Sequence, residues 1–223
     1  MIISLLFLIL CWKLLYSILL LIFIEYKIAN NIRCFINNIL FITLYNIVPS
    51  VSIIYIPLSS YIFDTYLIYK DSKTLIRFIK DPMTIHHIIA IIIGFYIIND
   101  YLRYENFALY YITYLSNIFI YISYHFIKRF PNYKLLNNIL LIIQTIVYSY
   151  FRVYILTLFL YNNLNTLLSA SVVDKIMMGL IYMLGIVWSG KLYYKVFNLI
   201  YNLLEVMDHS RIVGEWEDRV YEK

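Results

Sequence analysis

Apolar residues dominate seven long stretches of the chain, and short polar segments separate these stretches. A helix of about 20 apolar residues crosses the hydrocarbon core of a bilayer, which is about 30 Å thick. Pro49 divides what would otherwise be one overlong helix, because proline interrupts helical hydrogen bonding. The pattern therefore predicts an all-α, polytopic integral membrane helical bundle of about seven transmembrane helices, near residues 2–24, 35–48, 51–69, 83–98, 107–127, 135–160 and 176–198.

The composition supports this class, since 63% of the residues are hydrophobic and only 14% are charged. Soluble domains carry roughly 25% charged residues. Many residues are Ile, Tyr, Asn, Phe or Lys, whose codons are rich in A and T, so we expect an A/T-rich source genome. Cys11 and Cys34 match neither a disulfide framework nor a metal-binding spacing. We therefore expect membrane lipids as partners, no nucleic acid, and no metal or other cofactor.

Basic residues divide unevenly between the two sets of loops that seven spans create. Fourteen of them fall on one side, including Arg33, whereas only Arg103 and Lys175 fall on the other. The richer side is expected in the cytoplasm, so the N-terminus is predicted to be lumenal or external and the C-terminus cytoplasmic. We expect three parts: a first transmembrane helix and loop, a membrane domain, and a polar cytosolic tail, at 1–31, 32–200 and 201–223.

Ionisable residues are rare within the predicted spans, where a charge costs roughly 2.5–3.5 kcal/mol. Such residues usually face the interior of the bundle and mark function. Arg152, deep in the sixth span, suits a buried structural or ligand-pairing role. For each histidine, an interfacial position among the lipid headgroups is the alternative. The direction of the spans places four ionisable residues at a similar depth near the cytoplasmic edge, namely Asp64, His86, His87 and His125.

Three blocks of the sequence resemble the TLC-domain family, whose members include ceramide synthases and non-enzymatic lipid-related proteins. The first, "LSSYIFDTYLIY" followed by "DPMTIHHIIAIIIGFY", is similar to the family's Asp-bearing span and its Asp-x-x-x-x-His-His element. The second, "YITYLSNIFIYISYHF", is similar to the block in which family members carry an acidic residue before Leu-Ser. The third pairs "NNILLIIQTIVYSYFRVYIL" with "MLGIVWSGKLYYKVF", similar to the family's Asn-then-Arg span and its last, Trp-containing span.

The blocks follow the family's order over roughly residues 32–200, which implies a TLC-like fold in the endoplasmic reticulum membrane. The resemblance makes His86, His87 and Asp64 the candidate catalytic residues. The candidate lipid-binding residues are Arg152, Asn117, Trp188 and Asn138. The chain departs from the family at three positions: Tyr114 replaces the acid, Asn117 replaces the second Asp of ceramide synthases, and Gly185 replaces an Asn of the last span.

Two functions remain open on this reading. The first is lipid binding or handling without turnover, in membrane lipid metabolism or homeostasis, which the missing acids favour. The second is a ceramide synthase-like N-acyltransferase that uses acyl-CoA, with the His86/His87 pair as general base. A seven-span receptor is a remote alternative, as is a zinc-dependent membrane hydrolase with Asp64, His87 and His125 as ligands.

Overall fold

The chain is helical throughout the part that the structure describes. This structure is a computed structural model, and it describes residues 2–48, 50–99 and 104–221. No strand occurs among these residues, so the all-α prediction is confirmed. The helices are α1 (Ile2–Phe23), α2 (Tyr26–Ile47), η1 (Val51–Ile54), α3 (Tyr55–Ser72), α4 (Leu75–Lys80), α5 (Pro82–Ile98), α6 (Tyr104–Arg129), α7 (Lys134–Ser149), η2 (Tyr150–Ile155), α8 (Leu156–Asn162), α9 (Leu164–Ser169) and α10 (Val172–Tyr221).

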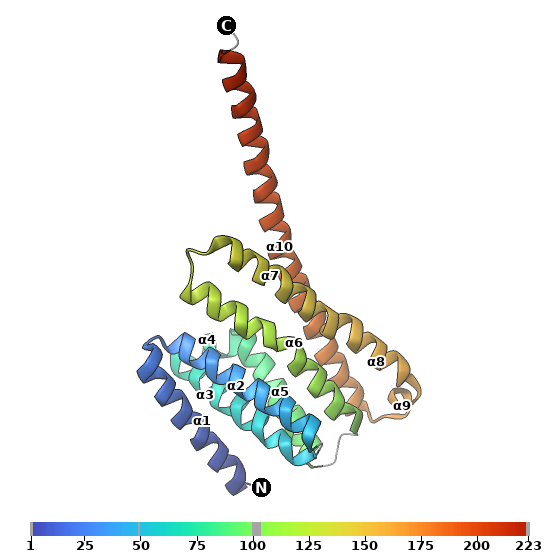
Figure 1. Ribbon diagram of the computed structural model, residues 1–223. Helices are drawn as coiled ribbons and strands as arrows, with labels where there is room; N and C mark the ends of the chain where they lie inside the picture. The colour runs from blue at the N-terminus through green and yellow to red at the C-terminus, as the bar shows by residue number, and fades with distance from the viewer. Residues whose placement is uncertain (1, 49, 100–103, 222–223) are drawn as a thin grey trace.

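The long helices run back and forth through one bundle (Figure 1). Each of the seven predicted stretches corresponds to a helical segment, and short turns make successive long segments antiparallel. The pairs α2–α6, α3–α5, α6–α7 and α7–α10 pack against each other, and α1 packs on α2 and α3. The N-terminus lies at one end of the bundle, and α10 leaves at the other end (Figure 1).

Four helical segments of the described chain are long and apolar enough to cross a membrane: Ile2–Phe23, Val51–Ser72, Lys134–Asn162 and Val172–Asn202. A shorter apolar helix covers Met83–Ile98. These segments identify a membrane protein. The segments α2 and α6 carry more polar side chains, so the count of seven spans stays a prediction.

The start of α2 corrects one boundary and one assignment made from the sequence. The helix begins at Tyr26 rather than near residue 35. Arg33, which we had placed in a cytoplasmic loop, lies inside this helix with 0% of its surface exposed. The reason is that the polar residues at the start of α2 face partners within the bundle instead of water. At the other end of the chain, α10 continues without a break through the predicted tail as far as Tyr221.

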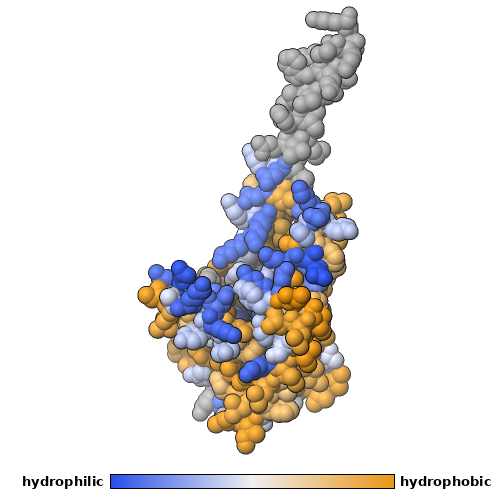
Figure 2. All heavy atoms as spheres, turned by 90° about the vertical axis from the view of Figure 1, so that its left-hand side faces the viewer, coloured by the Kyte–Doolittle hydropathy of each residue, from blue (hydrophilic) through white to orange (hydrophobic). Residues whose placement is uncertain are grey.

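Aromatic packing between α2 and α6 forms the centre of the bundle. The ring of Phe41 lies 4.7 Å from that of Tyr114, and the ring of Tyr45 stacks on Tyr111 at 4.0 Å. On the face of the molecule that Figure 2 shows, hydrophobic side chains cover most of the half farther from the α10 extension. Hydrophilic side chains gather in the half closer to that extension. This division is typical of a membrane protein with one polar end.

Candidate functional site

A buried ion pair joins α2 to α3. The guanidinium of Arg33 contacts the carboxylate of Asp64, and 0% and 9% of the two side chains are exposed. Arg33 also donates hydrogen bonds to the Ser60 hydroxyl at 2.8 Å and to the Asn30 side-chain oxygen at 3.0 Å. Asn30 in turn donates to Asp64 at 3.1 Å, and the Cys34 thiol donates to the other carboxylate oxygen at 3.4 Å. The carboxylate of Asp64 is therefore fully engaged by α2.

Aromatic residues enclose this ion pair and connect it to α1. The Arg33 guanidinium lies 5.0 Å from the centre of the Phe63 ring and 5.9 Å from that of Trp12. The Trp12 indole donates a hydrogen bond to the Ser59 hydroxyl at 2.8 Å. A guanidinium is favourably placed over aromatic faces when it is shielded from water. Three helices thus share one desolvated charge network.

The two candidate histidines lie on α5 around the ring of Tyr61 on α3. The ring centres of His86 and His87 are 6.0 Å and 5.2 Å from that of Tyr61. His87 is only 6% exposed, and it is within electrostatic range of Asp64. The Nδ1 atoms of both histidines are buried and find no hydrogen-bond partner among the described residues. Two imidazole nitrogens therefore remain able to bond a guest molecule or water.

Arg152 lies in the middle of η2, a π-helical segment between α7 and α8. Its Nε donates to the Ser116 hydroxyl at 2.8 Å, and its Nη2 approaches the Thr113 carbonyl at 3.4 Å and the Asn117 side-chain oxygen at 3.5 Å. The guanidinium also lies 5.4 Å from the centre of the Tyr148 ring. Within the described residues, no carboxylate forms an ion pair with this 4% exposed side chain. Arg152 is thus a buried cation held by neutral groups.

The three departures from the TLC pattern all lie close to these groups. Tyr114 is buried in the aromatic core, where the Asn38 side chain donates to its carbonyl at 2.9 Å. Asn117 accepts a hydrogen bond from Arg152. Gly185 on α10 lies against the backbone of η2, since a Cβ built there would be 3.0 Å from the Arg152 carbonyl oxygen. Tyr114 supplies packing at the position where the resemblance predicts an acid.

The other candidates lie elsewhere in the bundle. His125 packs against Phe23 on α1, with ring centres 6.4 Å apart. Trp188 lies under the ammonium of Lys191, which is 4.6 Å from its ring. Asn138 precedes Arg152 by 14 residues of the same helical run, a separation of about 21 Å along the axis. The structure therefore brings Arg152 and Asn117 together but leaves Asn138 far from them.

Sequence reasoning missed two features of this region, the burial of Arg33 and the π-helical segment. The first has a signal in the chain, because Asn30, Arg33 and Asn37 are spaced so that they share one face of a helix. The π-helix has no such signal that we can identify. Segments of this type are rare and occur frequently at functional sites.

An apolar groove borders the same π-helical segment on its outer side. It has a volume of about 320 Å³ and lies between η2 and α10, with Ile146, Ser149, Tyr150, Val153, Tyr154 and Tyr193 as lining residues. Ligand sites of this size are usually apolar with a few polar groups. The Ser149 hydroxyl is buried here and has no hydrogen-bond partner among the described residues.

A metal centre does not assemble from the described side chains, since no three of their histidine, cysteine, aspartate or glutamate residues are arranged to hold an ion. Comparisons with protein-family models, with curated proteins and with solved structures returned no match. The chemistry that the site offers is therefore read from its own geometry: one neutralised carboxylate, two imidazoles with free nitrogens, and one buried guanidinium without a carboxylate partner in the described region.

Proposed function

We propose that this chain is a multi-pass membrane protein of TLC-like architecture that acts in membrane lipid metabolism or homeostasis by binding a lipid headgroup. The observation that carries this proposal is Arg152, a buried guanidinium bonded to Ser116, Asn117 and the Thr113 carbonyl. The ligand is a lipid whose headgroup carries a phosphate or carboxylate, and it is bound without turnover.

The energetics of a buried cation support an anionic ligand. A charged side chain within a membrane usually pairs with another charge or lines a substrate path. Hydrogen bonds to neutral acceptors satisfy part of the guanidinium, but they leave its net charge uncompensated. A planar guanidinium suits phosphate and carboxylate groups, because it offers paired donors to two oxygens. His86 is within electrostatic range of Arg152, and its buried Nδ1 atom has no hydrogen-bond partner among the described residues.

Binding fits the arrangement better than catalysis does. A general base of the histidine type works best when a carboxylate orients it. The Asp64 carboxylate accepts hydrogen bonds from Arg33, Asn30 and Cys34, and a tyrosine occupies the position of the family's acid. We place an acyl chain in the open apolar groove that borders η2, whose lining residues do not include Arg152. N-acyl transfer from acyl-CoA is the competing function, and the experiment below includes it.

The proposed placement in the membrane has seven spans, a lumenal or external N-terminus and a cytoplasmic C-terminus, in the endoplasmic reticulum. Support comes from the antiparallel course of the helices and from the opposite ends at which the two termini lie (Figure 1). The helix ends next to the turns on the α10 side carry Lys27, Lys70, Lys128, Arg129 and Lys134, which matches the expected cytoplasmic side.

The test is a lipid-dependent thermal unfolding measurement on the purified full chain in a neutral detergent. Phosphatidic acid and phosphatidylserine are added in one series, and phosphatidylcholine and diacylglycerol in another. A ligand that binds only the folded state at 100 times its Kd stabilises it by about 2.7 kcal/mol. We expect this stabilisation from the anionic lipids in the wild type, its loss in Arg152→Gln, and its retention in the exposed control Lys175→Gln.

Two further measurements distinguish a variant that does not fold from a protein that does not bind the headgroup. Arg152→Lys keeps the charge and is expected to retain part of the stabilisation. Equal responses of the wild type to anionic lipids and to diacylglycerol would contradict headgroup binding even if Arg152→Gln does not fold.

The competing acyltransferase function is tested separately. The wild type and a His86→Ala/His87→Ala variant are given labelled acyl-CoA and sphingoid base. Labelled N-acyl product from the wild type alone would establish the acyltransferase instead.

A further inference from the structure

The short helix α4 exposes large apolar side chains outside the bundle. It connects α3 to α5, and its residues Leu75, Ile76 and Ile79 are 61%, 66% and 57% exposed. Connections between helices are normally polar where they meet water. Three neighbouring aliphatic side chains in so short a connection therefore need an apolar surrounding that the bundle itself does not supply.

The same helix has a basic side. Successive residues of a helix are about 100° apart around its axis. One side of α4 is therefore formed by Leu75, Ile79 and Ile76, and the adjacent side is formed by Lys80 and Arg77. Lys70 and Lys73 precede the helix, and all four basic side chains are exposed. The acids of this connection have local roles, because Asp81 caps the first turn of α5 at 2.8 Å and Asp71 accepts a hydrogen bond from Tyr26 at 3.4 Å. The apolar side is thus bordered by cations.

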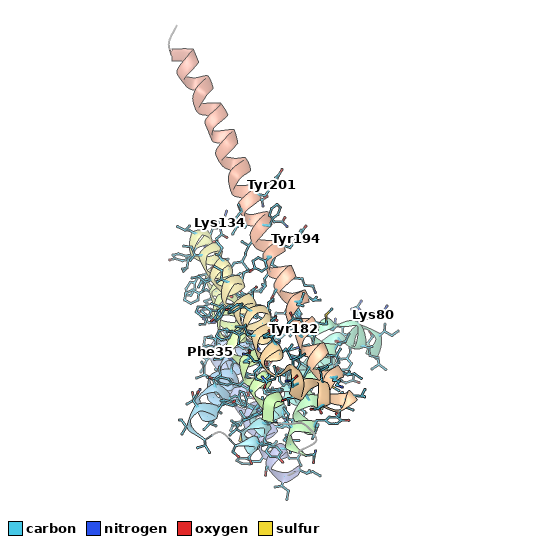
Figure 3. The ribbon with its side chains drawn as sticks, turned by 90° about the vertical axis from the view of Figure 1, so that its right-hand side faces the viewer. Phe35, Lys80, Lys134, Tyr182, Tyr194 and Tyr201 are labelled. Atoms are coloured by element: carbon cyan, nitrogen blue, oxygen red, sulfur yellow. The ribbon has the colours of Figure 1, made fainter. Side chains whose placement is uncertain are left out.

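The surrounding chain fixes α4 at the edge of the membrane. The segment Val51–Ser72 is long and apolar enough to span a bilayer, and α4 begins three residues after it ends. Lys73 turns the chain with a left-handed backbone (φ 58°), and the Thr74 hydroxyl caps α4. The Phe78 ring packs on Tyr69 of α3 with a centroid distance of 5.5 Å. Figure 3 shows Lys80 where the chain projects sideways from the bundle.

We propose that α4 is an interfacial anchor that binds the anionic surface of the leaflet on the α10 side. Leu75, Ile76 and Ile79 enter the boundary between headgroups and acyl chains. The basic residues contact anionic headgroups such as phosphatidylserine. A helix with apolar residues on one side and Lys or Arg beside them lies in this plane and favours anionic lipids. The basic residues of the α6–α7 turn, which include Lys128, Arg129 and Lys134, extend the positive surface at the same end.

The experiment measures where α4 lies in a bilayer of known composition. The full chain, with Cys11→Ser, receives an environment-sensitive fluorophore at Ile76→Cys and is reconstituted into nanodiscs of phosphatidylcholine alone or with phosphatidylserine. Quenching by aqueous iodide is compared with quenching by lipids that carry a nitroxide near the headgroup. Asn132→Cys, in the exposed polar turn between α6 and α7, is the matched control. Buried Cys34 is left unchanged.

We expect nitroxide quenching and iodide protection at position 76 in the mixed bilayer, and iodide quenching at position 132 in both bilayers. Each basic residue near an anionic surface contributes about a fivefold change in the bound-to-free ratio, so Arg77→Gln/Lys80→Gln should lower insertion about 25-fold. Iodide quenching at position 76 in the mixed bilayer would overturn the proposal. Equal insertion with and without phosphatidylserine would overturn the role of the charges. Protection from iodide at position 76 in both bilayers without nitroxide quenching would mean that protein, and not lipid, covers α4.

Discussion

Arg33 on α2 and Asp64 on α3 form an ion pair that is closed off from solvent by Phe63 and Trp12. Because the Asp64 carboxylate is paired with Arg33, it is not free to orient a catalytic histidine. The pair also gives α1, α2 and α3 a shared polar contact inside an otherwise apolar bundle. A buried pair of this kind is expensive to break, because the remaining partner keeps its charge without compensation.

Removing one member of the pair is expected to destabilise the protein strongly. Asp64→Asn or Arg33→Met should each cost about 3–5 kcal/mol of unfolding free energy, measured by thermal or denaturant unfolding in detergent. The double variant Arg33→Met/Asp64→Leu should recover much of that loss, because it leaves no unpaired charge. Asp71→Asn, at an exposed position, is the control and should change stability little. Equal stability of Asp64→Asn and the wild type would contradict the pairing.

Gly185 is expected to be intolerant of a methyl group, whereas Gly190 on the same helix should accept one. A Cβ at Gly185 would meet the Arg152 carbonyl oxygen at 3.0 Å, but nothing lies within 4 Å of a Cβ at Gly190. Overpacking of this type costs about 1–3 kcal/mol. The unfolding midpoint should therefore fall for Gly185→Ala and stay or rise slightly for Gly190→Ala. A similar change in the unfolding midpoint of both variants would show that α10 does not pack closely against η2.

Ile24 offers an opportunity to stabilise the turn between α1 and α2. Its backbone is left-handed (φ 61°), and its side chain is 84% exposed, so little packing is lost on its removal. The left-handed conformation costs a residue with a Cβ about 1–2 kcal/mol, and the greater freedom of unfolded glycine cancels about 0.4–1 kcal/mol of the gain. Ile24→Gly should thus raise stability modestly in the same unfolding assay.

The matched control for this turn is Leu14→Gly, at a 64% exposed position in the middle of α1. Glycine in a helix interior costs about 1 kcal/mol, so this variant should be less stable than the wild type. A loss of stability in both variants would indicate that the turn has another backbone conformation.

The membrane placement predicts that the end of α6 and the end of α8 face opposite compartments. Cysteines are introduced at exposed Lys128 and exposed Asn162 in a Cys11→Ser protein, and a membrane-impermeant thiol reagent is applied to sealed microsomes. We expect labelling of position 128 from the cytosolic side and of position 162 only after permeabilisation. Labelling of both positions without permeabilisation would reduce the number of spans.

The sequence predicted the helical segments well and the contents of the site only in part. Apolar runs located the long helical segments but not the short helices α4 and α9, because a hydrocarbon environment requires every backbone group to bond within its own segment. The start of α2 was wrong for the converse reason: its polar residues suggested a loop, yet the bundle gives them partners. Arg152 was singled out as a charge deep in an apolar segment and Asn117 by resemblance, and the two lie in contact. Asn138 was grouped with them by resemblance and lies far away.

The amino-acid sequence by itself determined the class of this protein, because local hydrophobicity and length decide which segments become helices in a membrane. Only the tertiary structure decided which polar residues meet. Arg33 and Asp64 are separated by 31 positions, and Arg152 and Ser116 by 36. Their pairing depends on how whole helices pack and rotate, and that depends on the shapes of all the side chains between them. Hydropathy records the position of each charge along the chain, but the packing of the helices determines its partner.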